Sequence, residues 1–233
     1  MATYVLIPGA GGQSWYWHLV SELLRRQRHH VIAPDLPAAN ESARLHDYVE
    51  SVVRAIAGHS PDDLIVVGQS MGCLTAPIVC TQVRARLLVL VAPMIPRPGE
   101  SGFEWWESTG QAEAAAAWAR EEGRDPGAFD PVEIFLHDLS GTTRAEALER
   151  PVQQCQGPFL DPWPLESWPD IPTRVVACRK DRLFPLAFLR RMSRERLGIE
   201  PDVMDTGHLP ALADPGALCA LFERYRCELG IAS

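Results

Sequence analysis

The sequence is poor in lysine and in long apolar segments, and acidic side chains outnumber basic ones. Lys180 is the only lysine among 22 basic residues, and 30 Asp and Glu residues leave a formal net charge of −8 over 233 residues. This balance argues against nucleic acid or an anionic membrane as the main partner. The longest apolar run, residues 87–95, is far shorter than the ~20 residues that span a bilayer.

The chain also lacks a basic leader and paired cysteines. No basic segment precedes the apolar stretch at residues 4–7, which argues against a signal peptide. The six cysteines form no C-x-x-C pair and have no zinc-like spacing, and most lie in apolar runs, where a free cysteine packs as a small hydrophobe. We therefore expect a soluble, cytoplasmic protein without a metal site.

Short apolar segments alternate with longer helical patterns along most of the chain. Several runs are continuously apolar, which is typical of buried strands, and the last is weaker: 4–7, 31–33, 64–67, 87–91, 175–178 and 203–204. Between strands, apolar residues recur at helical spacing, as in 45–56 and 218–225. This alternation predicts an α/β protein with a mostly parallel, doubly wound sheet covered on both faces.

The alternation breaks between residues 97 and 170. This stretch has no clear strand, contains an alanine-rich helical pattern near residues 111–122, and holds five of the seven tryptophans: Trp105, Trp106, Trp118, Trp163 and Trp168. A long segment of this kind inside a compact domain is typical of a lid, and the alternative is a helical decoration with its own small core. We predict a core of residues 1–96 and 171–233, with residues 97–170 as a small helical lid inserted between two strands.

Residues 68–72 read Gly-Gln-Ser-Met-Gly, a G-x-S-x-G pentapeptide. The pattern alone is weak, but an apolar strand runs into it and a helical pattern begins at Cys73. This context predicts the sharp strand–turn–helix that lifts a serine hydroxyl above a sheet. Ser70 is therefore the predicted nucleophile, and the alternative is a serine in an ordinary tight turn.

A serine nucleophile needs a base, and seven histidines compete for that role. His208 falls in a loop between the last weak strand and the final helix, at the carboxyl ends of the strands, where ligands bind in such sheets. His137 lies in the predicted lid and is a candidate substrate contact. The others are expected to be solvated or packing residues: His18, His29, His30, His46 and His59.

The acid is expected between the serine and the histidine in chain order. Asp181 stands three residues beyond the predicted strand 175–178. Asp205 is the competitor, but it lies three residues from His208 on one short segment, where an aspartate more often caps or turns the backbone. The predicted triad is therefore Ser70, Asp181 and His208.

A glycine-rich loop, residues 8–12, follows the first predicted strand. It lacks G-x-G-x-x-G, because Ser14 occupies the closing position, and it lacks G-K-[ST]. A dinucleotide or phosphate loop is therefore disfavoured, and no cofactor is expected. Together with a serine nucleophile, the loop predicts an oxyanion hole whose donors are the N–H groups of Ala10 and Met71.

These residues resemble the α/β-hydrolase superfamily, and in particular its short branch of plant methyl esterases, hydroxynitrile lyases and small bacterial esterases. The resemblance extends over nearly the whole chain and rests on residues 8–12 with Trp15 and Trp17, on residues 34–37 (Pro-Asp-Leu-Pro), on the G-x-S-x-G turn, on Asp181, and on Gly207-His208 ahead of Pro210. It implies the α/β-hydrolase fold. In that branch a histidine usually begins the first loop, and Pro8 replaces it in this chain.

The resemblance also separates two activities. The hydroxynitrile lyases carry threonine after the loop histidine and lysine after the catalytic histidine, where this chain has Gly9 and Leu209. Ester hydrolysis is therefore expected instead of cyanide elimination.

The expected substrate is a small to medium apolar ester-like molecule, cleaved through an acyl-enzyme. The residues expected to line its pocket are Gly9, Trp105, Trp106, Phe135, His137 and Phe159. The same constellation serves lactone, thioester and carbon–carbon bond hydrolases, and a non-catalytic ligand receptor is the alternative of a different class. The sequence does not indicate an oligomeric state.

Overall fold

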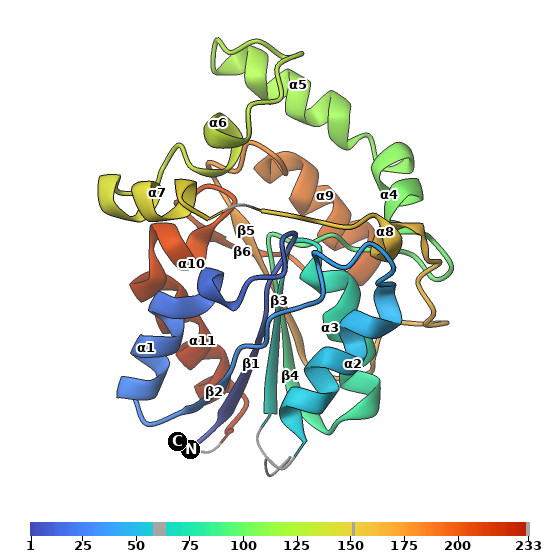
Figure 1. Ribbon diagram of the computed structural model, residues 1–233, viewed down its shortest axis with the longest axis vertical. Coiled ribbons are helices and arrows are strands. Elements are labelled where there is room, and N and C mark those ends of the chain that lie inside the picture. Colours follow the sequence, from blue (N-terminus) through green and yellow to red (C-terminus); the bar gives the residue numbers. More distant parts are fainter. Residues whose placement is uncertain (58–63, 151, 232–233) are drawn as a thin grey trace.

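A computed structural model describes residues 1–57, 64–150 and 152–231. Its centre is a six-stranded sheet in the order β2-β1-β3-β4-β5-β6, in which neighbouring strands are parallel. The strands are β1 (Thr3–Ile7), β2 (His30–Ile32), β3 (Leu64–Gln69), β4 (Ala85–Val91), β5 (Thr173–Cys178) and β6 (Asp202–Met204). Each strand predicted from the sequence is present, and the doubly wound α/β class is confirmed (Figure 1).

Helices cover both faces of the sheet, which explains why its strands are apolar throughout. One face packs against α2 (Leu45–Ile56), α3 (Gly72–Gln82) and α9 (Leu186–Leu197), and the other against α1 (His18–Arg26), α10 (Pro210–Ala213) and α11 (Pro215–Glu228). A short 3-10 helix, η1 (Ser14–Trp17), leads into α1. Successive residues of β1 alternate between the two clusters, with Val5 and Ile7 in one and Tyr4 and Leu6 in the other.

The final helix begins where its capping residues predict. The side chain of Asp214 accepts a hydrogen bond from the N–H of Ala217 at 2.9 Å, and Pro215 occupies the first turn. Across the described residues, no helix is both long and apolar enough to cross a membrane.

Between β4 and β5 the chain leaves the sheet for residues 97–170, which we call the insert. It contains α4 (Gly102–Ser108), α5 (Gln111–Glu121), α6 (Pro131–Phe135), α7 (Gly141–Leu148) and α8 (Gly157–Leu160). Of its described residues, only Ser101 and Pro162 form a β-type pairing, as an isolated bridge. Figure 1 shows these helices over the carboxyl ends of the strands, at the opposite end of the molecule from both termini.

Candidate active site

Ser70 lies in the tight turn between β3 and α3. Its φ of 51° falls in the left-handed region, which residues other than glycine rarely adopt. The flanking glycines permit the turn, because a Cβ at Gly68 would lie 2.9 Å from Cβ of Ala76 and a Cβ at Gly72 would lie 2.5 Å from the carbonyl oxygen of Pro8. Local strain and close packing therefore hold Ser70 above the end of the sheet.

Ser70, His208 and Asp181 form a continuous series of hydrogen bonds. Oγ of Ser70 lies 2.9 Å from Nε2 of His208, and Nδ1 of the same ring lies 2.7 Å from Oδ2 of Asp181. The other carboxylate oxygen accepts the N–H groups of Leu183 and Phe184, both at 2.8 Å. Asp181 is fully buried. A carboxylate on Nδ1 favours the tautomer in which Nε2 is free to accept the proton of Ser70.

The loop that carries His208 is held from two sides. Nε2 of Gln69 donates to the carbonyl oxygen of His208 at 3.1 Å. From the insert, Oδ2 of Asp138 accepts the N–H of Gly207 at 2.5 Å. Gln69 lies inside the G-x-S-x-G motif, but no sequence pattern points to Asp138. Both residues restrain the backbone on which the position of the imidazole depends.

Two backbone N–H groups beside Ser70 are free to bind a ligand. Within the described part of the chain, the N–H groups of Ala10 and Met71 have no hydrogen-bond acceptor, whereas those of Gly11 and Gly12 do. Ala10, Met71 and Ser70 all line the same cavity. Two unpaired backbone donors beside a serine hydroxyl are the groups from which an oxyanion hole is built.

The competing acid and the other histidines lie elsewhere. Asp205 is exposed, with Oδ2 2.9 Å from Nζ of Lys180, and this hydrogen bond holds the pKa of Asp205 below its usual value. Five of the other histidines have different surroundings: His18 contacts Trp15, buried His29 contacts Glu223, His46 contacts Asp47, His30 is exposed on β2, and His59 lies outside the described residues.

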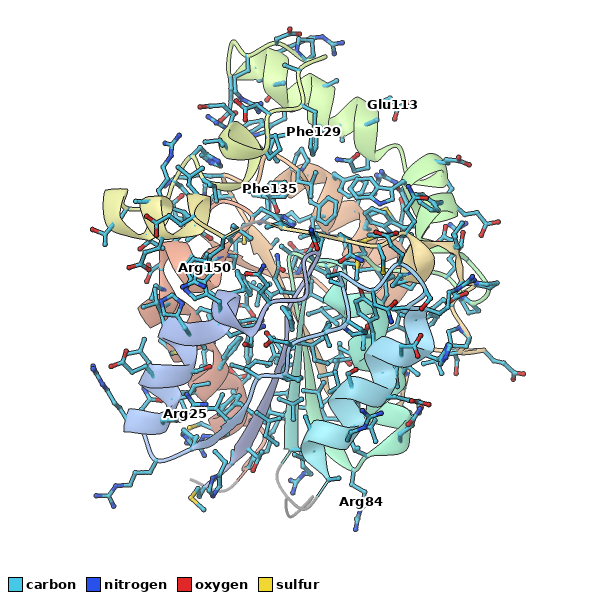
Figure 2. The ribbon with its side chains drawn as sticks, viewed as in Figure 1. Arg25, Arg84, Glu113, Phe129, Phe135 and Arg150 are labelled. Atoms are coloured by element: carbon cyan, nitrogen blue, oxygen red, sulfur yellow. The ribbon has the colours of Figure 1, made fainter. Side chains whose placement is uncertain are left out.

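A cavity of about 670 Å³ opens over Ser70 and His208, with mostly apolar walls. Phe129 and Phe135 lie beneath α5 in Figure 2, and the ring of Phe135 is centred 5.5 Å from that of His208. One face of α5 also lines the cavity, through alanines at helical spacing: Ala112, Ala115, Ala116 and Ala119. The cavity therefore connects Ser70 to an apolar chamber formed largely by the insert.

Comparison with known families agrees with this geometry. The model of the "Alpha/beta hydrolase family" matches residues 4–221. The chain belongs to this family. It is accordingly an enzyme of the alpha/beta hydrolase type, as its sequence predicts.

Some relatives of this hydrolase are distant in sequence but align with it over nearly their whole length. It is similar to norfluorocurarine synthase 2 of Strychnos nux-vomica, with 22% identity covering 93% of this chain and 92% of the relative. It is also similar to methyl jasmonate esterase 1 of Vitis vinifera, with 24% identity and coverages of 94% and 95%. The solved structure of polyneuridine aldehyde esterase has a TM-score of 0.79 at 18% identity, with coverages of 97% and 99%. These matches include the plant esterases that the sequence resembles.

Two of the six residues predicted to line the substrate pocket of the hydrolase do not line the observed cavity. Trp105 is not among the described residues that line the cavity. Its side chain is fully buried, donates from Nε1 to the carbonyl oxygen of Ile95 at 3.0 Å, and packs on Phe184. His137 does not line the cavity either and packs against Gly207. The remaining predicted residues do line the cavity: Gly9, Trp106, Phe135 and Phe159.

The insert of the hydrolase also contacts the loop that carries Asp181. Arg182, which follows Asp181, places Nε 3.1 Å from Oε2 of Glu122 and Nη1 3.0 Å from Oε2 of Glu133. The side chain of Arg182 is only 16% exposed. Partial burial weakens solvent screening of the pair with Glu122, which therefore joins the insert to the loop of Asp181 more firmly than a surface pair would, whereas the carboxylate of Glu133 is 55% exposed.

Proposed function

We propose that the protein hydrolyses carboxylic esters through a serine acyl-enzyme. The observation that carries this proposal is the unbroken series of hydrogen bonds from Asp181 through His208 to Ser70, at the base of an apolar cavity. The similarity to a methyl jasmonate esterase and a polyneuridine aldehyde esterase supports an ester as the substrate.

In the proposed mechanism, Nε2 of His208 takes the proton of Ser70 as Oγ attacks the carbonyl carbon of the ester. Asp181 keeps the other ring proton on Nδ1 and stabilises the imidazolium that forms. The N–H groups of Ala10 and Met71 stabilise the tetrahedral oxyanion. The imidazolium then protonates the leaving alcohol, and the neutral ring activates a water that releases the acid and restores the serine.

The walls of the cavity support a substrate with an apolar acyl or alcohol group of small to medium size. The alanine face of α5 leaves room above the nucleophile, and Phe135 and Trp106 supply apolar contact area. In this proposal residues 97–170 act as a lid, because they cover the nucleophile and keep water away from the reacting ester, while residues 1–96 and 171–233 carry the catalytic groups.

Labelling with a fluorophosphonate, followed by mass spectrometry of the modified peptide, tests the proposal. The label is expected on Ser70 in the wild-type protein and on no residue in Ser70→Ala. Hydrolysis of p-nitrophenyl butyrate is expected to fall at least ~10³-fold in Ser70→Ala. Ser42→Ala, which removes an exposed hydroxyl, is the matched control and should retain full activity.

Unchanged hydrolysis in Ser70→Ala would refute the serine mechanism. Tight binding of apolar esters without labelling or turnover would instead favour a ligand receptor. A parallel panel of lactones and thioesters identifies the acyl bond that the enzyme cleaves fastest.

A further inference from the structure

One side chain of the insert, Gln154, is bonded directly to the loop that carries the N–H of Ala10. Its Oε1 accepts the N–H of Gly11 at 2.9 Å, across 143 positions of sequence. Its Nε2 donates to Oη of Tyr48 at 2.9 Å and to the carbonyl oxygen of Cys155 at 2.8 Å. The acceptor and both donors of the Gln154 amide are therefore in use.

These partners also decide which way the amide faces. If the amide were reversed, Nε2 would face the N–H of Gly11, and Oε1 would face the carbonyl oxygen of Cys155. Each contact would set two donors or two acceptors against each other in a partly buried site, which is unfavourable. Oε1 of Gln154 is therefore the atom that faces the loop.

Behind Gln154, hydrogen bonds continue into the core. Oη of Tyr48 lies 3.6 Å from Sγ of Cys155, and Sγ lies 3.7 Å from the carbonyl oxygen of Ala43. Burial raises the pKa of Tyr48, so its phenol stays protonated and keeps a proton to donate. The N–H of Cys155 also donates to the carbonyl oxygen of Ala38 at 2.8 Å. The part of the insert around Gln154 and Cys155 is thus bonded to the core at Ala38, Ala43 and Tyr48.

The bond to Gln154 acts on the peptide that follows Ala10. The peptide before Ala10 is held by a second bond, from the N–H of Gly12 to the carbonyl oxygen of Gly9 at 3.1 Å. The N–H of Ala10 points away from that carbonyl, because the peptide is trans. Gly11 has a φ of 89°, a conformation that glycine adopts without strain. Because glycine also adopts many other backbone conformations, the loop is flexible unless a contact from another segment holds it.

We propose that Gln154 is a positioning residue for the oxyanion hole, holding the peptide after Ala10 so that the N–H of Ala10 stays aimed at the oxyanion. This inference rests on the proposed serine-hydrolase function. Donors that are already in place stabilise a transition state without reorganising during the reaction. Loosening the loop is therefore expected to slow the chemical step more than it weakens binding of the ester.

Gln154→Leu tests the proposal, because leucine keeps much of the side-chain volume and removes both ends of the amide. We expect kcat for p-nitrophenyl butyrate to fall about 10- to 100-fold, less than the ~10²–10³-fold for removal of an oxyanion donor, while KM changes by less than about threefold. Gln153→Ala is the matched control, since Gln153 is the preceding residue and is exposed. That variant should keep the wild-type kcat and KM.

A pair of inhibitors separates loss of the oxyanion hole from general damage to the pocket. A trifluoromethyl ketone forms a tetrahedral adduct with Ser70 that carries the oxyanion, whereas the matching methyl ketone binds mainly as a ground-state ligand. Gln154→Leu is expected to weaken the trifluoromethyl ketone by the same factor as kcat and to leave the methyl ketone unchanged. Equal weakening of both inhibitors, or no weakening of either, would overturn the proposal.

Tyr48→Phe provides a second variant if Gln154→Leu does not fold. It removes one acceptor of Nε2 and leaves the bond between Oε1 and Gly11 available, so we expect a smaller fall in kcat, of about two- to fivefold, with an unchanged KM. In that case, a wild-type kcat in Tyr48→Phe overturns the inference. Fluorophosphonate labelling of the wild-type protein keeps the two proposals apart: absence of the label on Ser70 overturns the proposed function, and its presence with unchanged variants overturns only the role of Gln154.

Discussion

Asp181→Asn is expected to change which ring nitrogen of His208 carries the proton. Oδ1 of Asp181 accepts two backbone N–H groups, those of Leu183 and Phe184, and Oδ2 faces Nδ1 of His208. An asparagine keeps the backbone bonds only if its oxygen faces the two N–H groups. Its NH₂ then faces Nδ1, so the ring must carry its proton on Nε2, the atom that faces Ser70. In that tautomer the ring cannot accept the serine proton.

The size of the effect follows from the cost of turning the amide round. The reversed amide restores the active tautomer but leaves the N–H groups of Leu183 and Phe184 facing an NH₂ group. Each buried donor left without an acceptor costs about 1–3 kcal/mol, so the reversed form lies about 2–6 kcal/mol higher. Since about 1.4 kcal/mol is a factor of ten, a midpoint of about 4 kcal/mol leaves ~10⁻³ of the molecules active. We therefore expect kcat/KM to fall by about 10³-fold, near the ~10⁴ found when a triad of this type holds the wrong tautomer.

The assay is steady-state hydrolysis of p-nitrophenyl butyrate, with the rate of fluorophosphonate labelling of Ser70 as a second readout. Both rates are expected to fall together, because both require the hydroxyl to lose its proton. Asp205→Asn is the matched control, since Asp205 is exposed and pairs with Lys180, and it should change the rate less than about twofold. A fall of less than about tenfold in Asp181→Asn, or equal falls in the two variants, would refute the reasoning.

Two further predictions concern the cavity and the stability of the insert. Ala116→Phe places a ring on the cavity face of α5 and should lower kcat/KM for p-nitrophenyl octanoate about tenfold more than for the acetate, whereas Ala117→Phe, on an exposed position, should leave that ratio unchanged. Glu100 pairs with Arg196, and these side chains are only 10% and 3% exposed. Burial raises the pKa of Glu100, but hydrogen bonds, above all from Arg196, outweigh it and leave the pKa below its ordinary 4.5. The ionised Glu100 therefore stabilises the fold fully above pH 4.5, and this stabilisation is lost as the pH falls through the lowered pKa. Glu100→Gln should accordingly lower the free energy of unfolding by about 3 kcal/mol near pH 7 and by clearly less near pH 3.5. Thermal denaturation at both pH values checks this against Glu107→Gln, an exposed control, and an equal loss of Tm at both would contradict it.

The turn around Ser70 could be predicted because its constraints fall on a short motif. Gly68 is required by contact with Ala76 on the following helix, and Gly72 by the carbonyl oxygen of Pro8 at the end of the neighbouring strand, so both close contacts act on glycines of the same five residues. Asp181 and His208 follow strands directly, and parallel strands bring their carboxyl ends to one edge of the sheet. Strand prediction and chain order were therefore sufficient to bring these side chains together.

The pocket could be predicted only in part, because composition does not decide where an aromatic side chain points. Trp105 and Trp106 are neighbours on α4, and adjacent helical residues face directions about 100° apart. Trp106 lines the cavity and Trp105 enters the core, where it packs on Phe184 and Phe188. The sequence offers no means of choosing between them, since both are large, apolar and in the same segment.

Gln154 and Asp138 could not have been found from sequence patterns, because each acts on a backbone N–H group that lies far away along the chain. Their partners, Gly11 and Gly207, are 143 and 69 positions distant. A side-chain acceptor of this kind requires no motif, since the group it binds is present in every residue except proline. Only the folded arrangement of the insert over the sheet brings these pairs together.

These long-range bonds bear on how the insert relates to the reaction. Gln154 holds the loop of the proposed oxyanion donor, Asp138 holds the residue before His208, and Glu133 pairs with the arginine that follows Asp181. The loops that carry Ala10, His208 and Asp181 are therefore each bonded to a different part of one segment. A movement of the whole insert away from the sheet would break all three contacts at once and would loosen the loops of Asp181, His208 and Ala10 together. The position of the insert and the geometry of the proposed active site are thus coupled by the same polar contacts. A lid that only covered an already complete site would not need these contacts.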